Sequence, residues 1–473
     1  MIFKVISTSL MAFIFFMSTE NKMGSMPIIK LIFNMSLPIM FSMLIMALYN
    51  IVDSIFVGMI GPEALTAVSL AFPVQNLMTA FGVGTSVGVN SLVSLRLGQK
   101  RQDDVNKTAM NGIFLSIVTW LVFATLGTVV TELYVRSQTS NPLIIEYGKQ
   151  YLDIILIFGL GPIVGTMLDR LLQSTGRTFL SMISQIVGAV FNCIFDPLLI
   201  FGIGPFPALG IRGAAIATVA GQIIGAVVSL WLNLKKNHDI KFYLKNIIPN
   251  RKIVGQIYKI AVPSILMTSI TSAITYFMNL ILGSTANGGD TAIAVYGVYF
   301  KLNSFIFMPV FGLCNGIVPI IAYNYGALHH RRITNTIRGA LLIALCIMTL
   351  GVVLFELIPG PLFALFSATP EMKRMGIVAL RVIAPSFFGA AIAITLSSVF
   401  QAFGNAVYSM LVSFSRQIIV FLPAAYLLSR TGNVDNVWWC FIIAEFMSVG
   451  MSLFFMRRIY VKKIKDIPMD EIK

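Results

Sequence analysis

The chain has 473 residues, of which 57% are hydrophobic and only 11% are charged, and its formal charge at pH 7 is +15. A typical soluble domain carries about 25% charged residues, so this composition excludes a disordered chain, a coiled coil and an ordinary soluble enzyme. The basic excess does not indicate nucleic-acid binding, because Lys and Arg lie in short clusters between apolar runs, without interleaved aromatic residues.

The N-terminal segment, residues 1–30, contains a short apolar stretch at 5–17. It resembles the core of a signal peptide, but no small-x-small cleavage site follows it. We interpret residues 1–16 as an upstream extension and Met17 as the natural start. A frayed or interfacial helix is the alternative interpretation.

Twelve apolar stretches follow, each long enough to cross the membrane, which takes about 20 residues. They are 31–58, 64–95, 108–130, 148–173, 178–201, 213–234, 253–283, 291–323, 335–355, 374–400, 406–428 and 437–457. Several are long enough to require tilt or a bend. Prolines within spans are expected to kink them, namely Pro38, Pro73, Pro162, Pro263, Pro309 and Pro385. The predicted fold class is therefore an all-α integral membrane protein with twelve transmembrane helices.

Basic residues are distributed unequally between alternate loops. One set of loops carries most of the Lys and Arg, in particular around 96–107, 235–252 and 457–473, whereas the other set carries only Arg136, Arg212, Lys373 and Arg430. Loops rich in Lys and Arg remain on the cytoplasmic side of a membrane. Both termini are therefore predicted to be cytoplasmic.

The two halves of the sequence repeat each other. Pro38 and Pro263 are 225 residues apart, and a series of further pairs lies 228 apart: Gly84/Gly312, Gly88/Gly316, Gly98/Gly326, Gln173/Gln401, Gly176/Gly404 and Ser181/Ser409. Six spans per half, starting on the same side, predict two lobes related by a parallel pseudo-two-fold repeat. The expected division is an N-lobe at 31–234, a cytoplasmic linker at 235–252, a C-lobe at 253–457 and a basic tail at 458–473.

Asp53 and Asp196 lie inside predicted spans, where an ionised group costs about 2.5–3.5 kcal/mol and is a functional candidate by default. Asp53 lies one turn from Asn50, and Asp196 shares a helix face with Asn192. Both aspartates are expected at a similar depth of the N-lobe. Proton uptake by the pair is one interpretation. A sodium ion held by Asp53, Asn192 and Asp196, with Asn50 as a further ligand, is another, and helix-end aspartates facing headgroup water are the structural alternative.

Other polar residues in the spans are weaker candidates. Asp169 precedes Arg170, so a local ion pair competes with a role in the cavity. Lys301 is either a buried countercharge or a lysine that snorkels to the interface, and Asn303 lies two residues beyond it. Arg381 and Glu445 are expected to be structural, as partners of one another or of the membrane interface.

Catalytic and metal-binding constellations are missing from the sequence. All four cysteines lie within apolar runs without a CxxC pair, and the three histidines, His238, His329 and His330, form no HExxH motif. A membrane enzyme therefore lacks support, and no cofactor is expected.

Several segments together resemble the multidrug and toxic compound extrusion (MATE) family, in particular its MepA-like bacterial branch. They are Ser36-Leu37-Pro38, the stretch 47–58 around Tyr49-Asn50-Ile51-Val52-Asp53, Leu97-Gly98-Gln99, Gln173-Ser174-Thr175-Gly176, Asp196-Pro197-Leu198-Leu199, Tyr299-Phe300-Lys301, Met308-Pro309-Val310-Phe311-Gly312 and Tyr323-Asn324-Tyr325-Gly326. No single motif is decisive, but the resemblance covers residues 17–460.

The resemblance implies a two-lobed exporter that exchanges an organic, often cationic, compound for inward H⁺ or Na⁺ by alternating access. Asp53 matches the family's first-helix acid, Asn192 and Asp196 match its fifth-helix pair, and Thr218 matches a sixth-helix hydroxyl ligand. Asp169 stands where Asn is common, which leaves its role open. The second lobe lacks the acids that some members carry, since Met278, Asn279 and Arg381 occupy those regions, so coupling is expected in the N-lobe.

The alternative function is a lipid-linked oligosaccharide flippase of the same superfamily. A flippase is expected to line its cavity with several Arg or Lys to hold pyrophosphate, whereas only Lys301, Arg381 and Arg416 are available here. The expected partners are small organic substrates and the lipid bilayer, with no nucleic acid and a monomeric state. The expected location is the bacterial cell membrane.

Overall fold

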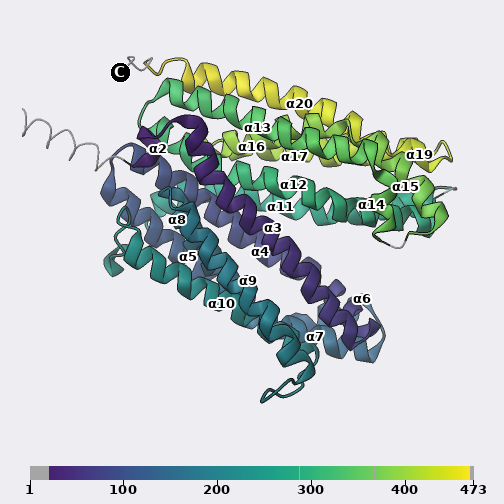
Figure 1. The fold of residues 1–473 in the computed structure, drawn as a ribbon. Helices are drawn as coiled ribbons and strands as arrows, with labels where there is room; N and C mark the ends of the chain where they lie inside the picture. Colours follow the sequence, from purple (N-terminus) through teal and green to yellow (C-terminus); the bar gives the residue numbers. More distant parts are fainter. Residues whose placement is uncertain (1–20, 287, 367, 469–473) are drawn as a thin grey trace, which may run out of the picture.

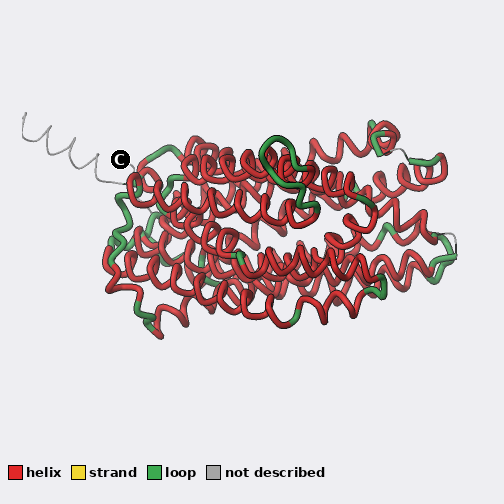
Figure 2. Tube along the Cα trace, turned by 90° about the horizontal axis from the view of Figure 1, so that it is seen from below, coloured by secondary structure: helices red, strands yellow, loops and turns green. Residues whose placement is uncertain are grey.

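The structure is a computed structural model that describes residues 21–286, 288–366 and 368–468. The extension expected at 1–16 and the apolar stretch at 5–17 lie outside the described residues. Within the described ranges every regular element is a helix, and the helices run roughly side by side with loops gathered at the two ends (Figure 2). This all-helical architecture agrees with the predicted fold class.

Ten helices are long and apolar enough to cross a membrane, and two bent helix pairs bring the number to as many as twelve in the described part of the chain. Their bounds are α3 (Ile28–Ile60), α4 (Pro62–Gly98), α5 (Gln102–Val129), α7 (Pro142–Ile157) with α8 (Leu160–Ser174), α9 (Thr178–Phe201), α10 (Ile211–Lys236), α11 (Arg251–Ser284), α12 (Gly289–Gly326), α13 (His330–Leu357), α15 (Pro370–Ile383) with α16 (Ser386–Ala402), α17 (Ala406–Phe414) continuing through the π-helical turn η2 (Ser415–Phe421) into α18 (Leu422–Ser429), and α19 (Val434–Val437) leading into α20 (Cys440–Ile459) and η3 (Tyr460–Ile464). Each predicted span overlaps one of these units.

Short elements connect the spans or precede them. They are α2 (Lys22–Ser25), α6 (Thr131–Gln138), the 3₁₀ turn η1 (Leu244–Ile247) and α14 (Pro359–Ala364). The segment 237–250, between α10 and α11, contains only η1 as regular structure.

Only two of the six prolines expected to kink their spans lie at a large bend. The α7–α8 pair bends by 41° at Phe158–Gly159, just before Pro162, and the α15–α16 pair bends by 53° at Ala384–Pro385. The other four, Pro38, Pro73, Pro263 and Pro309, lie inside helices that continue as single elements. The missing N–H of a proline costs one backbone hydrogen bond, and neighbouring packed helices support the chain on either side of it.

The helices form two groups, α3–α10 and α11–α20, which lie close together at the end marked by α2 and α8 and diverge toward α6 and α7 on one side and α14 and α15 on the other (Figure 1). We call the first of these the basic end, because Lys100, Arg101 and Arg177 lie in its connections and Lys235 and Arg331 lie at helix ends beside them. The contacts between the groups come mainly from α4 against α11 and α12, and from α3 against α12.

The two groups approach each other closely at two glycines, which occupy equivalent positions in the two halves of the chain. A Cβ atom on Gly98 of α4 would overlap the carbonyl oxygen of Tyr323 on α12, and one on Gly326 of α12 would overlap that of Leu95 on α4. Each glycine lies 228 residues from its counterpart, and so do the two carbonyls. The repeat seen in the sequence is therefore a structural repeat, in which each half packs the same position against the other.

Candidate functional site

A cluster of polar side chains lies between α3, α9 and α10, in the half of the N-terminal group away from the basic end. Asp196 on α9 is fully buried, and Asn192, one turn earlier, is almost so. The Asn192 Nδ2 atom donates hydrogen bonds to Asp196 Oδ1 at 3.1 Å and to Thr218 Oγ1 of α10 at 3.3 Å. The structure thus brings together Asn192 and Asp196, which their spacing placed on one face, and the Thr218 hydroxyl, which the family resemblance implied.

Asp53 completes this cluster from α3. Its carboxyl group and that of Asp196 are hydrogen-bonding neighbours, an arrangement that needs a proton on one of them because two carboxylates offer only acceptors. With both groups ionised, three buried oxygens receive no hydrogen bond from any described donor: Asp53 Oδ1, Asp196 Oδ2 and Asn192 Oδ1. A proton or a small hard cation, which oxygen ligands favour, would satisfy them.

Helix geometry explains why these side chains meet. Asn192 and Asp196 are four residues apart and share one face of α9, and that face packs closely on α10 through glycines. A Cβ on Gly188 would lie 2.8 Å from the carbonyl oxygen of Gly221, and one on Gly221 would lie 2.7 Å from that of Gly188. This close approach places Thr218, one turn before Gly221, against Asn192.

Two tyrosines and a glutamine border the cluster and were not expected from the sequence. The Tyr49 and Tyr151 hydroxyls are near enough to the two aspartates to interact with the charge of both, and Tyr49 also hydrogen-bonds with the Gln222 side chain. Tyr49 lies four residues before Asp53, so the spacing along α3 could have identified it. Tyr151 and Gln222 come from α7 and α10, and no local pattern connects them to Asp53.

Other sequence candidates lie outside this cluster. The Asn50 side chain is exposed rather than directed into the cluster as a ligand. The backbone carbonyl oxygen of Asn50 accepts a hydrogen bond from Ser54 Oγ at 2.8 Å. Lys301 is exposed, with its Nζ 5.8 Å from the centre of the Phe366 ring, which contradicts its interpretation as a buried countercharge. Asn303 is half-buried and accepts a hydrogen bond from the Tyr299 hydroxyl at 3.4 Å.

Asp169 occupies a separate polar site nearer the basic end. Its Oδ1 atom accepts hydrogen bonds from Ser184 Oγ of α9 at 2.6 Å and from Ser229 Oγ of α10 at 2.8 Å. Arg170 forms no ion pair with it among the described residues and donates instead to Gln173 Oε1 at 3.0 Å. The hydroxyls of two neighbouring helices therefore replace the local ion pair that the adjacent charges suggested.

The second lobe contains an ion pair between α20 and η2. Glu445 is buried, and its Oε1 lies 2.9 Å from Arg416 Nη1. Of the two alternatives expected for Glu445, Arg381 or the membrane interface, the pairing with Arg381 is therefore wrong, and the partner is Arg416. The exposed Arg381 belongs to α15, whereas α20 packs against α16 and η2, so the side chain opposite Glu445 comes from η2.

No group of three or more His, Cys, Asp or Glu side chains that could hold a metal ion occurs in the part of the chain that the structure describes. The oxygen cluster around Asp53 and Asp196 differs from such a group because half of its members, Asn192 and Thr218, are neutral. It is suited to a weakly held, exchangeable cation or a proton rather than to a tightly bound transition metal.

Comparison with known proteins gives consistent relatives over nearly the whole chain. The multidrug export protein MepA of Staphylococcus haemolyticus (strain JCSC1435) is 26% identical over 428 residues, which cover 90% of this chain and 93% of that protein. A FAD transporter of Shewanella oneidensis (strain MR-1) is 26% identical over 466 residues, covering 96% and 100%.

Solved structures share the fold. The outward-facing conformation of a multidrug resistance MATE family transporter of the MOP superfamily matches with a TM-score of 0.88 at 23% identity, covering 94% of this chain and 99% of that one. A MOP superfamily transporter from Pyrococcus furiosus matches with a TM-score of 0.87 at 22% identity, covering 94% and 98%.

The MatE family profile matches twice, at residues 38–198 and at 263–427, so that each lobe carries one copy of the family's repeat. Together the two matches cover more than half of the chain. The chain therefore belongs to the MATE family and is a multi-pass membrane transporter, not an enzyme.

Proposed function

We propose that this transporter exports organic compounds, many of them cationic, in exchange for H⁺ or Na⁺ moving inward, by alternating access of its two lobes. The observation that carries the proposal is the carboxyl pair of the half-buried Asp53 and the buried Asp196. The pair has Asn192 and Thr218 beside it and forms no ion pair with a Lys or Arg in the described ranges. Two of the relatives named above are a multidrug export protein and a multidrug resistance transporter, which supports efflux of varied compounds.

The coupling mechanism rests on the position of α3. This helix carries Asp53 and packs both on α9, which carries Asp196, and on α12 of the other lobe. Loading one proton or one sodium ion neutralises a carboxyl and joins α3 to α9 through a shared ligand. The ion and the contact between lobes are therefore linked through the same helix, as alternating access requires.

Each side chain of the cluster has a separate role. Asp53 and Asp196 take up and release the ion. The Asn192 amide donates to Asp196 and Thr218, which leaves its Oδ1 free as a neutral ligand, and Thr218 holds that amide in place.

The basic end is cytoplasmic in this proposal, because Lys and Arg accumulate in its loops. Both termini then face the cytoplasm of a bacterial cell. The two lobes meet at this end and diverge at the other (Figure 1), so the arrangement corresponds to the state open to the outside.

The test is efflux of a fluorescent organic cation from inverted membrane vesicles, driven by an imposed pH gradient in one arm and an imposed sodium gradient in the other. Asp53→Asn keeps the size of the side chain but holds no exchangeable proton and no charge. We expect this variant to insert at wild-type abundance and to lose gradient-driven transport in both arms. Undiminished transport by Asp53→Asn would contradict the coupling role.

An organic anion such as FAD is the second candidate substrate class, because one relative that matches along its whole length is named a FAD transporter. The charges near the described cluster favour the cation, since both of its ionisable members are acids. Adding FAD to the same vesicles as a competitor distinguishes the two classes: competition against the cationic dye would favour the anion.

A further inference from the structure

A short N-terminal strap, residues 21–26, joins the two lobes at the basic end. Met23 is fully buried among residues of the second lobe, and its carbonyl oxygen accepts a hydrogen bond from Asn324 Nδ2 at 3.0 Å. Arg332 Nη2 donates to the carbonyl oxygen of Met26 at 2.7 Å. On the other side, Asn21 Nδ2 donates to the carbonyl oxygen of Thr175 in the first lobe at 2.9 Å.

The strap carries Lys22, a cation without a carboxylate partner among the described residues, next to the first turns of α3. Lys22 Nζ donates to Asn34 Oδ1 at 2.6 Å, but no carboxylate lies within ion-pair distance of Lys22 among the residues that the structure places. Burial, and then the positive charge of nearby Arg177, hold the pKa of the Lys22 ammonium below its usual value. Arg177 has its own counterion in Asp239.

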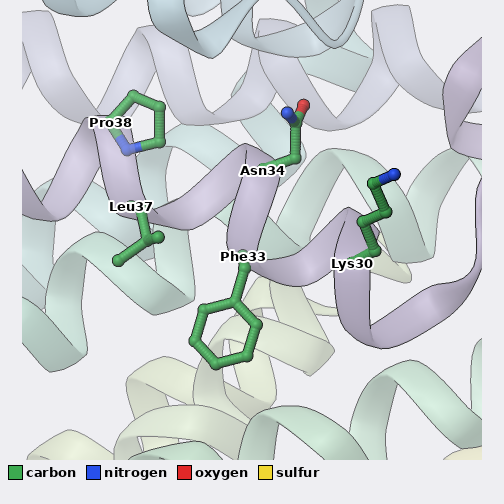
Figure 3. A pocket seen from close by; sticks show the side chains of 5 residues that line it. All are labelled: Lys30, Phe33, Asn34, Leu37 and Pro38. Atoms are coloured by element: carbon green, nitrogen blue, oxygen red, sulfur yellow. The ribbon is translucent and has the colours of Figure 1, made fainter.

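A cavity of about 340 Å³ adjoins this lysine on the surface of α3. Its lining is amphipathic: Lys30 and Asn34 present polar atoms, whereas Phe33, Leu37 and Pro38 are apolar (Figure 3). Phe33 and Leu37 are 43% and 46% exposed, and they lie one turn apart with their side chains extending in the same direction (Figure 3). Since a helix rises 1.5 Å per residue, Leu37 lies about 10 Å deeper in the membrane than Lys30.

We propose that this groove binds one anionic phospholipid from the leaflet at the basic end, with the phosphate held by Lys22, Lys30 and Asn34 and an acyl chain lying along Phe33 and Leu37. Cations at the headgroup level attract anionic lipids, and basic pockets between membrane helices bind their headgroups. The apolar half of the groove favours a lipid over a soluble phosphate, because Phe33 and Leu37 extend the surface directly into the acyl region.

The bound lipid has a consequence for the lobes. Its phosphate neutralises Lys22 on the strap and contacts Lys30 on α3, so the lipid fastens the strap to the first lobe while Asn324 and Arg332 hold it on the second. An anionic lipid in this groove therefore stabilises the arrangement in which the lobes meet at the basic end. The inference does not depend on which ion drives transport.

The experiment is native mass spectrometry of the purified full-length protein with equimolar phosphatidylglycerol and phosphatidylcholine, which have the same acyl chains. We expect the wild type to retain one phosphatidylglycerol preferentially, and Lys30→Gln to bind it about fivefold more weakly, the effect of one lysine near a membrane surface. Lys22→Gln is a second variant with the same expected loss. Lys252→Gln is the matched control, because Lys252 is also exposed and lies in the first turn of α11.

Thermal unfolding supplies an independent measurement. Phosphatidylglycerol should raise the Tm of the wild type and of Lys252→Gln, and raise that of Lys30→Gln less. Equal retention of both lipids, or equal losses in Lys30→Gln and Lys252→Gln, would overturn the proposal. Displacement of the bound lipid by millimolar glycerol 3-phosphate would also overturn it, since that outcome identifies a site for a soluble anion.

Discussion

Both lobes bury ionisable side chains between their fifth and sixth spans, but they arrange the charges differently. In the first lobe, Asp196 on α9 faces Asp53 of α3 and has only neutral partners on α9 and α10. In the second, Glu445 on α20 is paired with Arg416 on η2. A carboxylate with a fixed counterion has little need of a proton or sodium ion, whereas an acid pair without one does.

Equivalent positions of the repeat show which residues differ between the two lobes. Arg416 stands 228 residues after Gly188, and Glu445 stands 228 after Ala217. At these positions the first lobe packs backbone against backbone, with Gly188 close to Gly221, whereas the second inserts an ion pair and a π-helical turn. The acids themselves have no counterpart, because Val420 and Ala424 occupy the positions equivalent to Asn192 and Asp196. The same helix pair thus holds an acid with neutral partners in one lobe and an ion pair in the other.

The largest effect is expected for Asp196→Asn. This change removes the acid that faces Asp53, so gradient-driven efflux should fall roughly tenfold or more, within the usual range of a coupling free energy. Glu445→Gln is the matched acid-to-amide control in the other lobe, and its efflux per protein molecule should keep its dependence on the ion gradient. If Glu445→Gln removes that dependence and Asp196→Asn retains it, the assignment of the two lobes is reversed.

Glu445→Gln, which should have little effect on ion-driven efflux, is expected to lower the stability of the protein. Glu445→Gln leaves the guanidinium of Arg416 without its counterion, and because that side chain is only 28% exposed, we expect a loss of about 1–3 kcal/mol. Replacing both residues by methionine should restore most of it, since neither charge is then left unpaired. Thermal unfolding in detergent measures both variants. If the double methionine variant is no more stable than Glu445→Gln, the ion pair stabilises the lobe by more than the neutralisation of its two charges.

Although the two lobes differ in their buried charges, the glycine contact between them should respond equally to substitution on either side. Gly98→Ala and Gly326→Ala each force a methyl group into a carbonyl of the opposite lobe, and each should destabilise the protein by about 1–3 kcal/mol. Gly255→Ala is the control, because a Cβ there meets no other atom within 4 Å. Unequal effects of the two tested glycines, seen as different shifts of Tm, would show that the lobes do not share this contact equally.

A smaller effect is expected for Thr218→Val. The hydroxyl accepts one hydrogen bond from Asn192, and losing a bond worth about 0.5–1.5 kcal/mol should lower ion-driven efflux about two- to tenfold. Thr125→Val is a suitable control, because that exposed hydroxyl bonds only to the carbonyl of Leu121 on its own helix among the described contacts. A loss as large as that of Asp196→Asn would place the hydroxyl in direct contact with the ion.

Features that depend on neighbouring residues along the chain could be predicted before the fold was known. Twelve spans follow from apolar length, and the repeat follows from the constant separation of pairs such as Gly98 and Gly326. Asn192 and Asp196 could be placed on one face from their spacing alone, because a helix turns once in 3.6 residues. These inferences need no knowledge of how helices pack.

The partner that lies opposite each side chain depends instead on how the helices pack. Glu445 meets Arg416 rather than Arg381 because α20 packs on η2 and not on α15. Asp169 is bound by Ser184 and Ser229 instead of by its neighbour Arg170, and Tyr151 reaches the acid cluster from a distant helix. Partners of this kind depend on the rotation and crossing of whole helices, which sequence spacing within one helix does not specify.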